Sequence, residues 1–121
     1  MRIFKIKAFH RWAKSERVTD KMLKNAVTEI IKGLVEADLG AGLFKKRIAR
    51  SGEGKRGGYR TLLGYRENKR SVFFFGFTKN DMDDVEDDQK KDLKYMSSYY
   101  LNISDCQIEL FIKQGELIEV K

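Results

Sequence analysis

Hydrophobic residues recur along this chain with helix-like spacing in some segments and strand-like spacing in others. Across residues 20–37 they lie three and four positions apart, which predicts one long helix with a single buried stripe. The stripe comprises Met22, Leu23, Ala26, Val27, Ile30, Ile31, Leu34 and Val35. Thr19 or Asp20 can cap the first turn, because a side-chain oxygen there accepts a free backbone N–H. Gly40 and Gly42 are expected to end the helix and to allow a sharp reversal of the chain.

Strand patterns lie on both sides of this helix. Residues 2–7 alternate apolar and basic positions and predict a short strand, followed by one or two helical turns over residues 9–16. Three further strands are predicted, over residues 43–50, 59–66 and 71–78. The last contains four phenylalanines in an almost unbroken apolar run, so it belongs in the centre of the sheet. The short polar link at residues 67–70 predicts an antiparallel hairpin between the last two strands.

The chain becomes acidic after residue 80. Residues 81–92 hold seven acids, and apolar residues at helical spacing predict a helix over about residues 83–100. Residues 101–121 are expected to form an appendage, with a short helix capped at Ser104 or Asp105 and a closing strand. We therefore predict a single domain over residues 1–121, with an α+β fold in which helices pack on one face of an antiparallel sheet.

Positive charge is concentrated in the middle of the sequence. The formal net charge is +7, and residues 43–70 contain ten bases against two acids, whereas the rest of the chain has fifteen bases against sixteen acids. Residues 51–58 hold four glycines and are expected to form a flexible basic loop. Positive charge clustered on a folded scaffold is typical of proteins that bind polyphosphates, and it indicates nucleic acid as the partner.

Composition excludes several other classes of protein. Cys106 is the single cysteine, so neither an internal disulfide nor a cysteine-based zinc site can form. Residues 1–9 lack the apolar core of a signal peptide, and no apolar run is long enough to span a membrane. We therefore expect a cytoplasmic protein with no membrane partner. The acidic stretch lacks EF-hand spacing and the P-loop pattern is missing, so we expect no metal, no cofactor and no nucleotide hydrolysis.

The candidate binding residues lie in the basic segment. Neighbouring side chains of a strand point to opposite faces, so Lys45 and Arg47 would share one face, and Lys46 and Arg50 the other. Tyr59 and Arg60 directly follow two glycines, and they offer a flat ring for stacking and a planar fork for a phosphate. Cations beside an aromatic ring suit single-stranded RNA. The expected RNA-binding residues of this segment are Lys45, Arg47, Arg50, Arg56, Tyr59 and Arg66.

Three runs of this chain resemble the RelE/HigB branch of the RelE/ParE toxin superfamily. They are Leu43-Phe44-Lys45-Lys46-Arg47-Ile48-Ala49, Gly54-Lys55-Arg56-Gly57-Gly58-Tyr59-Arg60 and Phe74-Phe75-Gly76-Phe77-Thr78-Lys79-Asn80. The resemblance covers nearly the whole chain and implies a microbial-RNase-like fold of one sheet with helices against it. It also implies a toxin that cleaves messenger RNA in the ribosomal A site and that pairs with a cognate antitoxin.

The same resemblance implies roles for individual residues. Arg60 ends the family's Gly-Tyr-Arg motif, in which the arginine contacts the scissile phosphate. Lys79 matches the lysine that follows the last core strand, and it joins the expected RNA-binding residues. The best-known members have an arginine after that lysine and a tyrosine a few residues later, where this chain has Asn80 and Glu86.

Cleavage of RNA by its own 2′-hydroxyl makes three demands on a protein. One proton must be removed, another must be supplied, and extra negative charge on phosphorus must be stabilised. Arginine and lysine meet the third demand, and a lysine crowded by other cations can have a lowered pKa and move protons. The expected catalytic residues are therefore Lys46, Lys55 and Arg60. His10, the only histidine, lies far from this block and is expected to be a surface or capping residue.

Two other functions remain open on the sequence. One is a poison of a protein target such as gyrase, as in the ParE arm of the superfamily. The other is a catalytically inactive module that only binds an antitoxin. The glycine-rich basic loop and Arg60 favour the nuclease.

Overall fold

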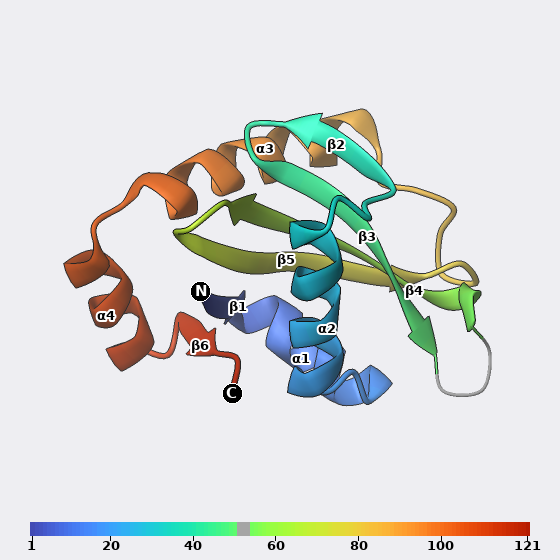
Figure 1. Cartoon of the computed structure of the whole chain (residues 1–121), viewed down its shortest axis with the longest axis horizontal. Coiled ribbons are helices and arrows are strands. Elements are labelled where there is room, and N and C mark those ends of the chain that lie inside the picture. Colours follow the sequence, from blue (N-terminus) through green and yellow to red (C-terminus); the bar gives the residue numbers. More distant parts are fainter. Residues whose placement is uncertain (51–53) are drawn as a thin grey trace.

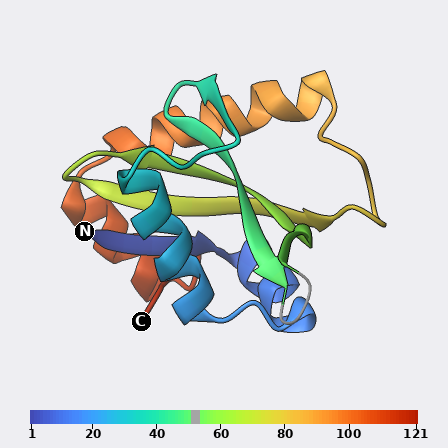
Figure 2. The same ribbon diagram turned by 45° about the vertical axis from the view of Figure 1, so that its right-hand side comes forward.

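A six-stranded sheet forms the centre of the protein, and two helices pack on each of its faces (Figures 1 and 2). The structure is a computed structural model that describes residues 1–50 and 54–121, with the backbone alone described for residues 54–56. The strands are β1 (Arg2–Ile6), β2 (Ala37–Gly40), β3 (Leu43–Arg50), β4 (Gly54–Arg66), β5 (Arg70–Thr78) and β6 (Leu117–Glu119). The helices are α1 (Lys7–Glu16), α2 (Asp20–Ile31), α3 (Asp87–Asn102) and α4 (Asp105–Lys113).

The strand order is β2-β3-β4-β5-β1-β6, which confirms the predicted α+β class with a largely antiparallel sheet. Only the β1–β5 pair is parallel among these neighbours. The predicted hairpin joins β4 to β5, and its turn holds Asn68 in the left-handed region at φ 60°. β5 lies between β4 and β1, as its continuous apolar run predicted.

Helices cover both faces of the sheet, whereas the sequence led us to expect them on one face. α1 and α2 pack with Phe73 of β5, while α3 and α4 belong to the cluster that contains Val72 and Phe74. Figure 2 shows α3 and α2 on opposite sides of the strands. The physical reason lies in β5 itself. A central strand that is apolar at nearly every position needs cover on both faces to keep its side chains from water.

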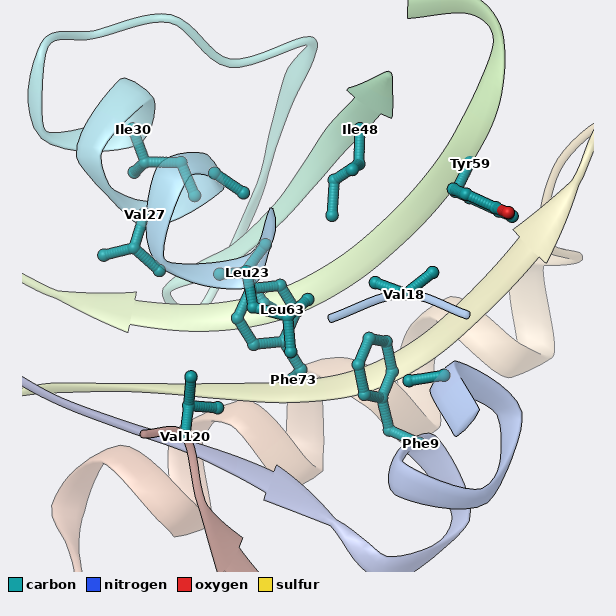
Figure 3. Close-up of a cluster of buried hydrophobic side chains, with 12 residues drawn as sticks. Phe9, Val18, Leu23, Val27, Ile30, Ile48, Tyr59, Leu63, Phe73 and Val120 are labelled. Atoms are coloured by element: carbon teal, nitrogen blue, oxygen red, sulfur yellow. The ribbon is translucent and has the colours of Figure 1, made fainter. Parts of the chain in front are cut away.

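The core on the α1–α2 side depends on the stripe of α2. Leu23, Val27 and Ile30 pack over the sheet, where Leu63 and Phe73 lie beneath them (Figure 3). Thr19 caps the helix, because its hydroxyl accepts the backbone N–H of Met22 at 3.3 Å. The stripe and the cap were both predicted from the sequence.

α2 is shorter than its apolar pattern predicted. It ends at Ile31, where the chain turns through Gly33 at φ +84°, a backbone conformation that favours glycine. Leu34, which continues the pattern in sequence, is 54% exposed. The residues that follow form β2, a strand that the sequence reading missed. Gly40 therefore ends β2 and Gly42 lies in the turn between β2 and β3, and neither ends a helix.

Residues 54–58 belong to a strand, whereas we expected them to be part of a flexible loop over residues 51–58, because β4 begins at Gly54 and not at Tyr59. Residues 51–53 lie outside the described part of the chain. Gly58 is required by the close approach of β3, since a Cβ at this position would lie 2.0 Å from the carbonyl oxygen of Ile48.

The C-terminal elements match their predictions, with Ser104 capping α4 through the N–H of Gln107 at 3.1 Å.

A polar cluster ties β1 to α2 on the α1–α2 side. Lys5 is 5% exposed, and its Nζ bonds Asp20 Oδ1 at 2.9 Å. The other oxygen of Asp20 accepts the backbone N–H of Lys121 at 2.8 Å. His10 lies beside this cluster, and its Nδ1 is buried with no hydrogen-bond partner among the described residues. Its pKa is lowered, because burial disfavours the charged imidazolium and the charges of Lys5 and Lys14 add to that effect, against an opposite contribution from Asp20.

We expect the Gly76→Ala variant to be destabilised by about 2 kcal/mol, since an added Cβ would lie 2.2 Å from the Trp12 ring in a packed core. Urea denaturation of the purified protein measures this. The matched control is Gly76→Ala in a Trp12→Leu background, where the smaller side chain leaves room and the loss should fall below about 1 kcal/mol. An equal loss in both backgrounds would contradict the steric explanation.

Acidification from pH 7.5 to 5.5 should lower the free energy of unfolding through His10. The unfolded chain takes up a proton on this residue near the ordinary pKa of 6.5, whereas the folded protein does so only at lower pH. The unfolded state therefore gains protons first, and stability falls as pH falls through this window. Denaturation curves at several pH values should show a flatter dependence for His10→Gln. An unchanged slope in that variant would show that another group titrates.

Candidate nucleic-acid interface

β3 carries the basic residues of the site, and its alternation divides them between the two faces of the sheet. Ile48 packs in the core beneath α2, whereas Leu43 packs in the core beneath α3 and α4. Lys46 points to the α2 side with Ile48, and Lys45 and Arg47 point to the other side with Leu43. The predicted sharing of a face by Lys45 and Arg47 is thereby confirmed.

Arg60 lies directly across from Arg47. The two residues are register partners in the β3–β4 pair, and Arg60 is in turn the partner of Phe77 on β5. Directly opposite side chains of such a pair have Cβ atoms about 5 Å apart. Two guanidinium groups thus start from neighbouring points on one face of the sheet.

The Arg60 side chain is buried, and one nitrogen of its guanidinium has no partner among the described residues. The residue is only 8% exposed, and its Nη1 makes no hydrogen bond with any described residue. A buried charged donor with no acceptor is costly, because it has lost water and gained nothing in exchange. Such a group is well suited to an anion that offers two oxygens to the planar fork, which is the geometry of a phosphate or carboxylate.

Lys45 extends this row of cations but already has an acceptor. Its Nζ lies 2.9 Å from the carboxylate of Asp84, in the segment between β5 and α3. Arg47 donates its backbone N–H to Glu36 Oε2 at 3.0 Å, while none of the described carboxylates forms an ion pair with its guanidinium. Lys79 follows the last residue of β5, beside the Thr78–Tyr59 pair, and is exposed at the same end of the sheet. Lys45, Arg47, Arg60 and Lys79 are therefore the expected residues that the fold brings together.

Lys46 does not belong to this group, which corrects its assignment from the sequence. It is 1% exposed, on the face opposite to Arg60, and its Nζ lies 2.7 Å from Glu29 Oε1 on α2 and 3.9 Å from Glu36 Oε1. A buried ammonium needs such a carboxylate to replace its lost hydration. Lys46 thus ties β3 to α2 and is not placed to touch RNA.

Tyr59 also differs from its prediction as a stacking residue. It is 4% exposed in the core on the α1–α2 side, where its ring meets Trp12 edge-on at 5.6 Å and its hydroxyl donates to the Glu16 carbonyl at 2.8 Å. Arg50 lies on the same side, with its guanidinium 5.7 Å from the centre of the Tyr59 ring. Because alternation sends Tyr59 away from Arg60, the two residues cannot act on one nucleotide.

Three further residues were expected at this site: Arg66, Lys55 and Arg56. Arg66 stands at the far end of β4, about 20 Å along the strand from Arg60, and its Nη1 bonds Asn102 Oδ1 at 2.9 Å. The side chains of Lys55 and Arg56 lie outside the described residues. No three metal-binding side chains gather within the described part of the chain, and none of the helices there is long and apolar enough to cross a membrane.

Asp84 is the site residue that sequence reasoning missed. Seven acids crowd residues 81–92, and nothing in their spacing distinguishes the one that reaches back to β3. A local signal is Val85, which like Met82 is an apolar residue within this acidic run, and which is 4% exposed and packs in the core beneath α3. By anchoring the segment to the sheet, Val85 brings its neighbour to Lys45.

A comparison with known protein families gives an independent result. The family model described as RelE toxin of the RelE/RelB toxin–antitoxin system matches residues 1–120. The match therefore includes all ten elements described above and the row of cations formed by Lys45, Arg47, Arg60 and Lys79, here called the cationic row.

Lys46→Ala should lower the free energy of unfolding by about 3 kcal/mol, because it removes the cation that faces Glu29. Urea denaturation tests this. Lys45→Ala, on the opposite face, is the matched control and should cost less than about 1 kcal/mol, since its ion pair is partly exposed. The pair Lys46→Met with Glu29→Gln should recover most of the loss. If Lys46→Ala were as stable as the parent, the buried ion pair would not have the structural role assigned to it.

Proposed function

The chain belongs to the RelE toxin family, and from that premise we propose that it is an endoribonuclease that cuts messenger RNA on the ribosome. The protein is a toxin of a toxin–antitoxin system, and its family implies a cognate antitoxin as partner. Toxins of this family are generally endoribonucleases. The substrate, its place in the ribosomal A site and a cytoplasmic location are the parts that this proposal adds.

The observation that carries the proposal is the buried Nη1 of Arg60, which has no partner among the described residues and lies beside Arg47. A scissile phosphodiester would give Arg60 the acceptor it lacks. The same anion would lie within reach of Arg47, which is directly opposite Arg60. It would also lie near Lys45, the diagonal neighbour of Arg60, since diagonal neighbours of a strand pair are about 7 Å apart. Cations on one face of a rigid sheet need little rearrangement to stabilise added negative charge on phosphorus.

The proposed reaction uses the RNA's own nucleophile. The 2′-oxygen attacks phosphorus, and the bond from phosphorus to the 5′-oxygen breaks. The 2′-hydroxyl proton passes to a base, and the leaving 5′-oxygen takes up a proton, so the products are a cyclic phosphate and a 5′-hydroxyl. Arg60 would bear the charge that builds up on the non-bridging oxygens. Of the two lysines first considered for proton transfer, Lys46 is engaged with Glu29, so Lys55 is the one retained in the proposal.

The Arg60→Met variant tests the proposal, since methionine keeps an apolar stem but removes the charge. Ribosome-dependent cleavage, followed by mapping messenger 5′ ends, should slow on the order of 100-fold, as when one donor to a developing oxyanion is lost. Thermal stability should stay level or rise, because the guanidinium Nη1 had no partner to lose. Arg66→Met, on the same strand, is the matched control and should cleave nearly normally. Equal rates for the two variants would contradict the proposal.

Expression of the parent chain without its antitoxin separates the alternatives. Arrest of translation with newly cut messages supports the nuclease. Arrest of DNA replication would indicate a gyrase-type target, and normal growth would indicate a module that only binds its antitoxin.

A further inference from the structure

Asp84 places a carboxylate at the edge of the proposed phosphate site. It bonds Lys45 Nζ at 2.9 Å, and Lys45 shares its sheet face with Arg47 and Arg60. Lys45 and Asp84 are 20% and 42% exposed in their side chains, so water reaches the pair. Ion pairs of this kind contribute little net stability, and an incoming anion can replace one partner.

A second cation stands next to the same carboxylate. Lys90, in the first turn of α3, has its Nζ 3.9 Å from Asp84 Oδ2. Asp84 therefore lies between a lysine of the phosphate site and a lysine outside it. A small rotation of its side chain would shorten one contact and lengthen the other.

Val85, the residue after Asp84, anchors this segment to the core. Val85 is buried in the core, and its N–H donates to Asp84 Oδ1 at 2.8 Å. Burial acts to raise the pKa of Asp84, but the hydrogen bonds from Lys45 and Val85 and the charges of Lys45 and Lys90 lower it overall. The carboxylate is therefore deprotonated at neutral pH, and both lysines lie near it.

We propose that the Asp84 carboxylate competes with a substrate phosphate for Lys45. When the phosphate binds Lys45, the carboxylate rotates and pairs with Lys90 instead. The inference rests on the proposed function, and it makes Asp84 a positioning and specificity residue of that site. An RNA held loosely gains little by displacing the carboxylate. An RNA whose phosphate also reaches Arg60 gains a buried partner as well, so the exchange favours a substrate that is presented in one fixed position.

Binding of a non-cleavable RNA tests this exchange. The probe is a short single-stranded oligoribonucleotide that is 2′-O-methylated throughout, titrated at low salt and followed by fluorescence anisotropy. Asp84→Asn should tighten Kd about threefold, because the amide still accepts the Val85 N–H but no longer competes for Lys45. Asp83→Asn is the matched control, since Asp83 is exposed and forms no ion pair with the described residues, and it should leave Kd almost unchanged.

The Lys90→Met variant distinguishes an exchange of the Asp84 carboxylate between two lysines from simple repulsion of the RNA by that carboxylate. It should weaken binding about twofold in the parent chain and clearly less in the Asp84→Asn background, where no carboxylate needs a new partner. In ribosome-dependent cleavage, Asp84→Asn should lower KM and leave kcat nearly unchanged.

Two results would overturn the inference: equal effects of Asp84→Asn and Asp83→Asn on Kd, or equal losses from Lys90→Met in both backgrounds. The failure of the proposed function would look different. In that case Arg60→Met would leave the affinity for the same oligonucleotide unchanged.

Discussion

A β-strand sends successive side chains to opposite faces, and in β3 this constraint separates two lysines that are neighbours in sequence. Lys46 enters the core on the α2 side and requires Glu29 there, since an ammonium cannot be buried without a counter-charge. Lys45 remains on the other face with Arg47, where β4 adds Arg60. This single alternation explains why two neighbouring lysines have different partners, and it places Lys45 on the face of the proposed phosphate site.

The charge of the basic segment is distributed differently in the fold than in the sequence. Acids from distant positions neutralise part of it, with Glu29 and Glu36 facing Lys46, and Asp84 facing Lys45. Among the described side chains, the guanidinium groups of Arg47 and Arg60 receive no such carboxylate. The excess counted along the chain therefore overstates the positive charge that is free to bind, and Arg47 and Arg60, which keep theirs, are register partners on the sheet.

The sequence predicted the features that depend on local pattern. Periodicity located every helix and five of the six strands, and alternation correctly placed Lys45 beside Arg47. It failed where the answer depended on residues far apart. Only packing decides that Leu34 leaves the helix, that α3 and α4 cover the second face, and that Tyr59 and Lys46 turn toward α1 and α2. The contact of Asp84 with Lys45 joins segments on either side of two strands, and no spacing rule could indicate it.

The pairing of β1 has a consequence for how the molecule assembles. This first strand lies between β5 and β6, with Arg2 opposite Arg70 and Phe4 opposite Glu119. The β3–β4–β5 meander uses only contacts between consecutive segments, so its chain closes short loops, whereas β1 must wait for partners made much later. During synthesis the cationic row can therefore take shape before the sheet is complete. β1, although made first, has no strand to pair with until β5 has been synthesised, so the nascent chain carries an unpaired strand at its N-terminal end until then.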